Sequence, residues 1–194
     1  MSSIPLTEKG NATRDRILSR ARQMLVDKGY NHLVMRNVAN ACDMKLGNLQ
    51  YYFPSHDALL RAIIEEETKR DLDIVQNTID QHQDSQQRLR SVVNILVTRW
   101  RGESAVVFST MYLLVLHDES YQSTYRNAYA TYYKLLEEVI SEVSPKLVKQ
   151  EVKTRARLVC ALIDGAPYQT DIGRRSRFLS RIEDQACEIA MSGV

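Results

Sequence analysis

Residues 45–52, with the sequence KLGNLQYY, place several hydrogen-bonding side chains within about two turns of one short predicted helix. These side chains are the amides of Asn48 and Gln50 and the phenols of Tyr51 and Tyr52. Asparagine and glutamine can each pair with the edge of an adenine, and tyrosine hydroxyls suit phosphate oxygens. Leu49 is expected to face inward. The spacing therefore predicts a helix that packs through Leu49 and presents its polar side to a nucleic acid.

Two further features favour a polyanionic partner. Gly47 costs about 1 kcal/mol relative to alanine in a helix interior, which is explained if the backbone lies close against DNA. Residues 1–62 carry 9 Lys and Arg against 5 Asp and Glu, whereas residues 63–194 carry 17 against 19. A plain surface glycine and a solvated basic face are the alternatives that the sequence leaves open.

A second group of side chains is aromatic and lies further along the chain. The first members are Trp100, Phe108, Met111 and Tyr112, followed by the tyrosine series Tyr121, Tyr125, Tyr129, Tyr132 and Tyr133. Along a helix this series forms a stripe with hydroxyl tips, which suits a pocket for an apolar or aromatic ligand oriented by a few hydrogen bonds. An aromatic packing seam explains the same spacing, so both interpretations stand.

The residues of catalytic and metal sites do not form a recognisable pattern. The four histidines are scattered, and neither a glycine-rich phosphate loop nor a nucleophile with a base partner is present in the sequence. The three cysteines, Cys42, Cys160 and Cys187, lack disulfide or zinc spacing. We therefore expect no enzyme activity, no metal and no cofactor. Without an apolar run of signal or membrane-spanning length, a cytoplasmic protein is expected.

The elements that would position these groups are helices. Scarce glycine and proline, 7 and 4 of 194 residues, favour an all-α fold. An apolar face predicts a first helix over residues 13–28, capped by Thr13 and stopped by Gly29. Two short helices separated by the turn 43–45 follow and predict a helix-turn-helix, and Ser55 caps the next helix. Further helices are expected at 85–101, 104–117, 119–143, 146–166 and 174–191.

Gly29, Tyr30 and the segment VMRNVANACDMKLGNLQYYFPSHDALL, residues 34–60, resemble the TetR family of transcriptional regulators. The resemblance implies a flexible arm at 1–10, a three-helix helix-turn-helix DNA-binding domain at 11–56, and a larger helical ligand-binding and dimerisation domain at 57–194. It implies a homodimeric repressor that leaves double-stranded operator DNA when a small-molecule effector binds. A ligand-dependent activator, or a helical carrier that does not bind specific DNA, is the alternative.

The DNA contacts implied by this resemblance lie on and beside the second short helix, which enters the major groove in a helix-turn-helix. They are Arg36, Lys45, Leu46, Gly47, Asn48, Gln50, Tyr51, Tyr52 and His56. The chain departs from the family pattern at several positions, with Asp43 in place of the turn glycine, Leu33 and Val34 in place of threonines, Lys45 in place of a serine cap, and His56 in place of a lysine. The operator sequence therefore cannot be borrowed from a relative.

In the C-terminal part, the resemblance implies an effector pocket lined by Trp100, Phe108, Met111, Tyr112, Tyr121, Tyr125 and Tyr129. It also implies a dimer interface in the last two helices, for which the apolar residues Leu158, Leu162 and Ile163 are the candidates. The phrase ALIDG, residues 161–165, is similar to a motif of the betaine-regulator-like subgroup but does not identify the ligand. Arg174, Arg175, Arg177 and Arg181 form a basic cluster that we interpret as a charged surface.

Overall fold

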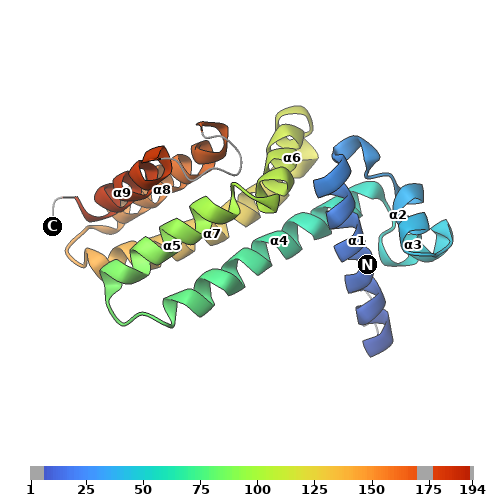
Figure 1. Ribbon diagram of the computed structural model, residues 1–194, viewed down its shortest axis with the longest axis horizontal. Helices are drawn as coiled ribbons and strands as arrows, with labels where there is room; N and C mark the ends of the chain where they lie inside the picture. The colour runs from blue at the N-terminus through green and yellow to red at the C-terminus, as the bar shows by residue number, and fades with distance from the viewer. Residues whose placement is uncertain (1–6, 170–176, 193–194) are drawn as a thin grey trace. The chain divides into compact units, whose positions relative to one another are not determined.

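The computed structural model describes residues 7–169 and 177–192 (Figure 1). Within these ranges the regular structure consists of nine α-helices and two short 3-10 helices, without a strand. The predicted all-α fold class is therefore confirmed. The chain divides into two compact units, Met1–Glu66 and Glu67–Val194, and the division falls within α4, His56–Ile79. None of the helices described is both long and apolar enough to cross a bilayer.

The first unit contains α1 (Glu8–Lys28), the 3-10 helix η1 (Tyr30–His32), α2 (Met35–Ala41), α3 (Leu46–Tyr52) and the start of α4. Helix α1 begins earlier than residue 13, because Thr7 is its cap and accepts a hydrogen bond from the Gly10 amide at 3.2 Å. The Thr13 hydroxyl instead donates to the Lys9 carbonyl at 2.9 Å, as threonines inside helices do. Residues 8–10 of the predicted arm are thus helical, and residues 1–6 lie outside the described residues.

The core of the first unit draws on every one of its α-helices. The buried apolar residues are Ile17, Leu18, Ala21 and Leu25 of α1, Val38 and Ala39 of α2, Leu49 of α3, Phe53, and Leu59 and Leu60 of α4. The turn between α2 and α3 places Asp43 at φ 51°, a left-handed conformation that aspartate adopts more readily than most residues. The turn predicted at 43–45 therefore forms with aspartate where the family pattern has glycine.

The second unit contains the rest of α4 followed by six further helices. They are α5 (Ser85–Arg99), α6 (Glu103–His117), η2 (Glu119–Tyr121), α7 (Gln122–Val143), α8 (Lys149–Gln169) and α9 (Arg177–Met191). Helices α8 and α9, the orange and red ribbons of Figure 1, lie side by side, and α7 packs against α8 and α5. Among the aromatic residues predicted from the sequence, this arrangement buries Trp100, Phe108, Tyr121, Tyr129 and Tyr132, whereas Tyr112 is exposed.

The predicted helix at 146–166 is displaced relative to α8, which begins at Lys149 and continues to Gln169. We expected a break from Pro167 onward, but the helix passes through this position. The end of α8 is tied to α6, because the hydroxyls of Tyr168 and Ser109 are hydrogen-bonded at 2.9 Å.

Candidate functional sites: an exposed polar helix and an aromatic cavity

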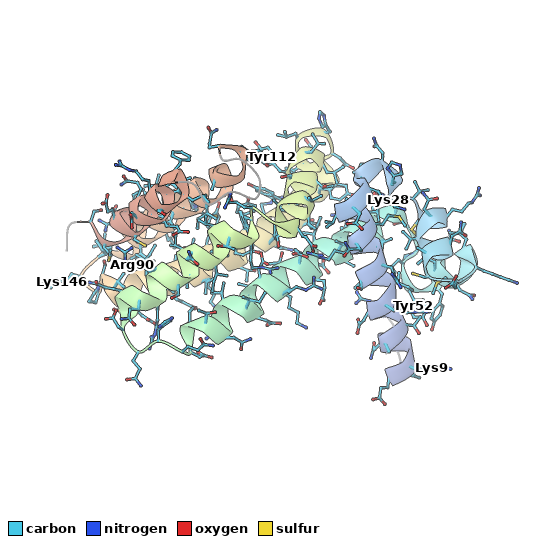
Figure 2. All side chains as sticks on the ribbon, viewed as in Figure 1. Lys9, Lys28, Tyr52, Arg90, Tyr112 and Lys146 are labelled. Atoms are coloured by element: carbon cyan, nitrogen blue, oxygen red, sulfur yellow. The ribbon has the colours of Figure 1, made fainter. Side chains whose placement is uncertain are left out.

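Helix α3 is anchored by one residue and exposes most of the others. Leu49 is fully buried and Phe53, just after the helix, is 3% exposed. Of the predicted DNA contacts, Arg36, Lys45, Gly47, Asn48, Gln50 and Tyr51 are exposed, and Leu46, Tyr52 and His56 are partly exposed. Tyr51 is 73% exposed and packs edge-on against Tyr52, with ring centroids 5.2 Å apart (Figure 2 labels Tyr52). The helix thus presents a polar face that the core does not use.

Gly47 has no packing role among the described residues. A Cβ added at this position would have no neighbouring heavy atom within 4 Å, apart from those of the helix itself. Alanine would therefore fit in the isolated protein and would favour the helix by about 1 kcal/mol. The glycine gives α3 a bare strip of backbone, to which another molecule can approach closely.

His56 stands at the first turn of α4, the position where the family pattern has a lysine. Ser55 caps this helix, because its hydroxyl accepts a hydrogen bond from the Ala58 amide at 3.1 Å. The imidazole lies edge-on to Tyr30 at 5.4 Å between centroids, and its Nδ1 is 3.7 Å from an Asp57 carboxylate oxygen. The ring is partly exposed at the positive end of a helix and can donate a hydrogen bond to an anion there.

The second site is a cavity of about 340 Å³ within the second unit, formed by residues of α6, α7 and α8 and by Trp100, which follows α5. It is lined by Trp100, Ala105, Phe108, Ser109, Tyr112, Tyr125, Tyr129, Ala161, Asp164, Gly165 and Tyr168. Five of these aromatic residues were predicted from the sequence as ligand contacts (Tyr112 is labelled in Figure 2). The two other candidates, Met111 and Tyr121, are buried but are not among the lining residues.

The aromatic rings around the cavity pack against one another. Trp100 stacks on Phe108 with centroids 5.0 Å apart and meets Tyr129 edge-on at 6.1 Å. Tyr125 and Tyr129, one helical turn apart on α7, lie 4.4 Å apart at a shallow angle. The tyrosine stripe is therefore both a packing seam and a cavity wall, so the two interpretations of its spacing describe the same residues.

Asp164 is the chemically distinctive residue of the cavity, and the sequence did not reveal it. The Tyr129 hydroxyl donates a hydrogen bond to its Oδ2 at 3.0 Å. Its Oδ1 is buried and no described residue donates a hydrogen bond to it. Burial raises the pKa of this carboxyl group to about 7, and the Tyr129 hydrogen bond opposes this rise. Asp164 lies in the segment ALIDG, residues 161–165. This segment resembles a family motif, but the resemblance does not predict that its aspartate faces a cavity.

Behind the cavity, a buried polar network joins α4 to the cavity wall. The Asp71 carboxylate of α4 accepts hydrogen bonds from the Trp100 indole at 3.1 Å, from the Tyr132 hydroxyl at 2.9 Å, and from Arg99. Burial raises the pKa of Asp71, and the adjacent Arg99 guanidinium opposes the shift. Trp100 therefore touches the cavity with its ring and α4 with its N–H.

Glu67 extends this network one turn nearer the start of α4. Its carboxylate accepts hydrogen bonds from the Ser104 hydroxyl at 2.6 Å and from Arg99 at 3.3 Å. The side chains of Glu67 and Asp71 are both fully buried, whereas Arg99 is 22% exposed. Because buried carboxylates require compensating charge and hydrogen bonds, Arg99 holds this part of α4 against α5 and α6.

The three candidate dimer residues on α8 have different environments. Leu158 is 49% exposed, Leu162 is partly exposed, and Ile163 is 1% exposed and contributes to the core of the unit. On the neighbouring helix α9, Phe178 is 48% exposed and was not among the predicted residues. Of the basic cluster, Arg174 and Arg175 lie outside the described residues and Arg181 is exposed. Leu158, Phe178 and Tyr168 are thus exposed large hydrophobic side chains on the described parts of α8 and α9.

Comparison with known proteins gives one match to a family model and several to individual proteins. Residues 17–63 match the model of the bacterial regulatory proteins of the tetR family. An uncharacterized HTH-type transcriptional regulator from the dhlA 5′ region of Xanthobacter autotrophicus is 49% identical over 55 residues, 28% of this chain and 27% of that protein. The matches to curated relatives thus span less than a third of the relatives' length.

Two solved structures resemble nearly the whole chain. A TetR transcription regulator from Haloarcula marismortui has a TM-score of 0.78 at 18% identity and covers 93% of this chain and 97% of its own. A transcriptional regulator from Saccharomonospora viridis, in complex with choline, has a TM-score of 0.77 at 19% identity and covers 94% and 97%. At these identities the likeness establishes the fold, and it confirms the predicted all-α architecture with an N-terminal helix-turn-helix.

Proposed function

We propose that this chain, whose residues 17–63 belong to the tetR family of bacterial regulatory proteins, is a homodimeric DNA-binding repressor released from its operator by a small molecule. The observation that carries the proposal is α3, which buries Leu49 and exposes Asn48, Gln50 and Tyr51 after a helix-turn-helix turn. A cytoplasmic location and the absence of enzymatic activity are parts of the same proposal.

Helix α3 would read DNA from the major groove, which is about 12 Å wide and admits one helix. Gln50 and Asn48 offer paired donors and acceptors to base edges, and Lys45 and Tyr51 suit phosphate oxygens. The bare backbone at Gly47 allows α3 to approach the groove closely. Arg36 on α2 and His56 on α4 are exposed or partly exposed and would hold the phosphate backbone on either side.

Two copies of α3 would occupy successive major grooves, about 34 Å or a related helical spacing apart, if the protein is a dimer. Support for a dimer comes from the exposed apolar side chains of Leu158 on α8 and Phe178 on α9. These two helices pack side by side, so one face of the pair can meet the same face of a second copy. Leu162, which is partly exposed, would join this interface.

Release by a ligand requires that occupancy of the cavity favours one arrangement of the protein over another. The cavity is of the size typical for small-molecule sites, which begin at about 300 Å³. Its wall residue Trp100 donates a hydrogen bond to Asp71 of α4, and α4 also carries His56 at its start. A ligand that shifts the Trp100 ring would thus act directly on the helix that continues into the DNA-binding unit.

The choline complex of the Saccharomonospora viridis regulator supports this proposal, because a protein of the same fold is found with a small molecule bound. Choline is accordingly one of the compounds to include in a search for the effector. The low identity, 19%, means that the cavity chemistry of this chain has to be argued from its own residues.

The proposal is tested by titrating the purified protein against the DNA upstream of its own gene at two salt concentrations. We expect a specific complex of dimer stoichiometry whose affinity falls steeply with salt, because phosphate contacts release counterions. The triple variant Asn48→Ala, Gln50→Ala and Tyr51→Phe should lose the preference for this DNA. Unchanged binding by that variant would show that α3 is not the reading surface.

The same titration separates the alternatives. A carrier would bind small molecules and show no preference for any duplex, with or without a compound panel. An activator would keep or strengthen its DNA complex when the effector is added, whereas a repressor of the proposed kind would lose it. Sedimentation of the free protein tests the dimer, and Leu158→Glu should shift it to a monomer while its helix content stays unchanged.

A further inference from the structure

We infer that the aromatic cavity takes a small organic cation, with the positive charge beside Asp164 and the apolar substituents against the surrounding rings. The inference rests on the proposed function in treating this cavity as the effector site. It goes further in naming the chemical class of the ligand. Three independent features of the cavity carry it: an unpaired carboxylate oxygen, the absence of a neutralising side chain among the described lining residues, and a wall made of aromatic rings.

The first feature is the hydrogen bonding of Asp164. Tyr129 donates to Oδ2 at 3.0 Å, while Oδ1 is buried and receives no hydrogen bond from any residue that the structure describes. A buried carboxylate oxygen without a donor is unfavourable, and native proteins usually supply a partner for it. A cationic ligand group placed at Oδ1 would supply that partner.

The second feature is the charge of the cavity lining. Apart from Asp164, the lining residues within the described ranges carry hydroxyl, indole, phenyl and methyl groups and no lysine, arginine or histidine. Arg157, on the same helix, lies over the ring of Tyr133 at 5.5 Å, and neither residue lines the cavity. An anionic ligand would therefore face a carboxylate of like sign, and a neutral apolar ligand would leave Oδ1 unpaired.

The third feature is the wall around Asp164. Trp100, Phe108, Tyr125 and Tyr129 contribute rings from three different parts of the chain, and Tyr112 and Tyr168 complete the lining. The faces of aromatic rings carry partial negative charge and attract cations, and groups of such rings recognise substituted ammonium ions. The rings also accept the alkyl or aryl groups of the ligand, so an ammonium bearing apolar substituents fits the lining better than an inorganic cation.

The ionisation of Asp164 links cation binding to pH. Burial raises the pKa of this carboxyl to about 7, so that part of the free protein holds it protonated at neutral pH. The titratable groups around it are Tyr125, Tyr129 and Tyr133 of α7, Tyr112 of α6, and Cys160 and Tyr168 of α8. Burial raises the pKa of Tyr125, Tyr129 and Cys160. Between pH 6 and pH 8, we therefore expect Asp164 to ionise and cation binding to strengthen.

The test uses three compounds that share one branched alkyl group, titrated into the full-length protein and followed by calorimetry and Trp100 fluorescence. Two are cations, 3,3-dimethylbutylammonium and its N,N,N-trimethyl derivative, and the third is the neutral 3,3-dimethyl-1-butanol. At pH 8 we expect at least one cation to bind about thirtyfold more tightly than the alcohol, as desolvated cation–aromatic contacts allow. The primary ammonium tests N–H donation to Oδ1, and the quaternary ion tests charge and ring contacts alone.

Asp164→Asn should abolish the preference for the cations, because the amide is close to the carboxylate in shape and carries no charge. Glu138→Gln is the matched control, since it removes one negative charge from an exposed site on α7 whose salt-bridge partner is Lys134. This control should bind all three compounds as the parent protein does. Circular dichroism establishes that both variants are folded.

The pH series provides a second readout that does not depend on any variant. Cation affinity should rise about tenfold from pH 6 to pH 8, as a carboxyl with a pKa of about 7 ionises, and the affinity of the alcohol should not rise. Equal binding of the alcohol and both cations at pH 8, or a cation preference that survives in Asp164→Asn, would overturn the inference.

These outcomes are separate from those of the proposed function, because the titrations contain no DNA. Specific operator binding without a cation preference would refute the ligand class and leave the regulator intact. Cation binding without any preferred duplex would refute the regulator and leave the ligand class intact. Release of the operator complex by the tighter-binding cation would support both together.

Discussion

Helix α3 and the aromatic cavity use their polar groups in opposite ways. On α3, one leucine is buried and the polar tips of its neighbours are exposed, so they are available to a large external partner. Behind the cavity, the Asp71 carboxylate is buried and accepts hydrogen bonds from Trp100 and Tyr132, and inside it Asp164 retains one buried oxygen without a described partner. An exposed polar surface costs little stability, whereas a buried polar site requires a network of partners that holds it in place.

The largest expected effect comes from breaking the network at Arg99. Arg99→Met would leave the buried carboxylates of Glu67 and Asp71 without their shared cation and should destabilise the second unit by about 3–5 kcal/mol. Urea denaturation followed by fluorescence of Trp100, the single tryptophan, measures this change. Arg90→Met is the matched control, because its ion pair with Asp184 is exposed and should contribute less than about 1 kcal/mol. An equal loss of unfolding free energy in Arg99→Met and Arg90→Met would mean that the network does not stabilise the second unit.

A smaller effect is expected at Asp164, and its sign depends on pH. The carboxyl has a folded pKa of about 7 against a usual value of 3.8, so the folded state favours the protonated form. The contribution of this carboxyl group to folding stability is fully present below pH 3.8 and is lost as the pH rises through 7. Relative to the parent protein, Asp164→Asn should therefore gain about 2–3 kcal/mol of stability between pH 5 and pH 8. Thermal or urea unfolding at the two pH values checks this, and a pH-independent difference would contradict it.

On the reading helix, the expected loss is in DNA affinity and not in stability. Gln50→Ala should weaken specific binding by about 1–3 kcal/mol if Gln50 contacts a base edge. Because the Gln50 side chain is exposed, the free energy of unfolding should change by no more than about 0.5 kcal/mol. Comparing the affinity of Gln50→Ala for the operator and for an unrelated duplex distinguishes a base contact from a phosphate contact. A loss that is equal on both duplexes would assign Gln50 to the phosphate backbone.

The smallest effect is expected at Gly47, where stability and binding should change in opposite directions. Gly47→Ala should stabilise the first unit by up to about 1 kcal/mol, because its Cβ would meet open space and alanine favours the helix. The same methyl group should weaken the DNA complex if the backbone approaches the groove. Circular dichroism during heating and an operator titration measure the two changes. An unchanged affinity would mean that Gly47 is a plain surface glycine.

Much of the first unit could be predicted from the sequence because its signals are local. The inward position of Leu49, the stop at Gly29, the Ser55 cap and the tolerance of Asp43 for a left-handed turn each depend on residues close in the chain. The start of α1 was missed because Thr7 and Thr13 are both possible caps. Only the hydrogen bonds of the folded helix distinguish a capping threonine from one inside a turn.

The second unit was less predictable because its defining contacts join distant residues. Five of the cavity's aromatic residues were predicted from the sequence, but Tyr168 was not, and the candidates Met111 and Tyr121 lie elsewhere in the core. Asp71 meets Trp100 and Tyr132 from residues 29 and 61 positions away, and Tyr129 meets Asp164 across 35 positions. No local pattern specifies such pairings.

The sequence by itself determined the all-α class, the helix-turn-helix and the side of α3 that is exposed, since periodicity, caps and turn residues act over a few positions. Only the tertiary structure decided which tyrosines line a cavity, that Asp164 faces into it, and that α4 is tied to its wall through Trp100. Burial and pairing of these groups depend on how α4 to α8 pack together. The chemistry of the cavity is therefore a property of that packing.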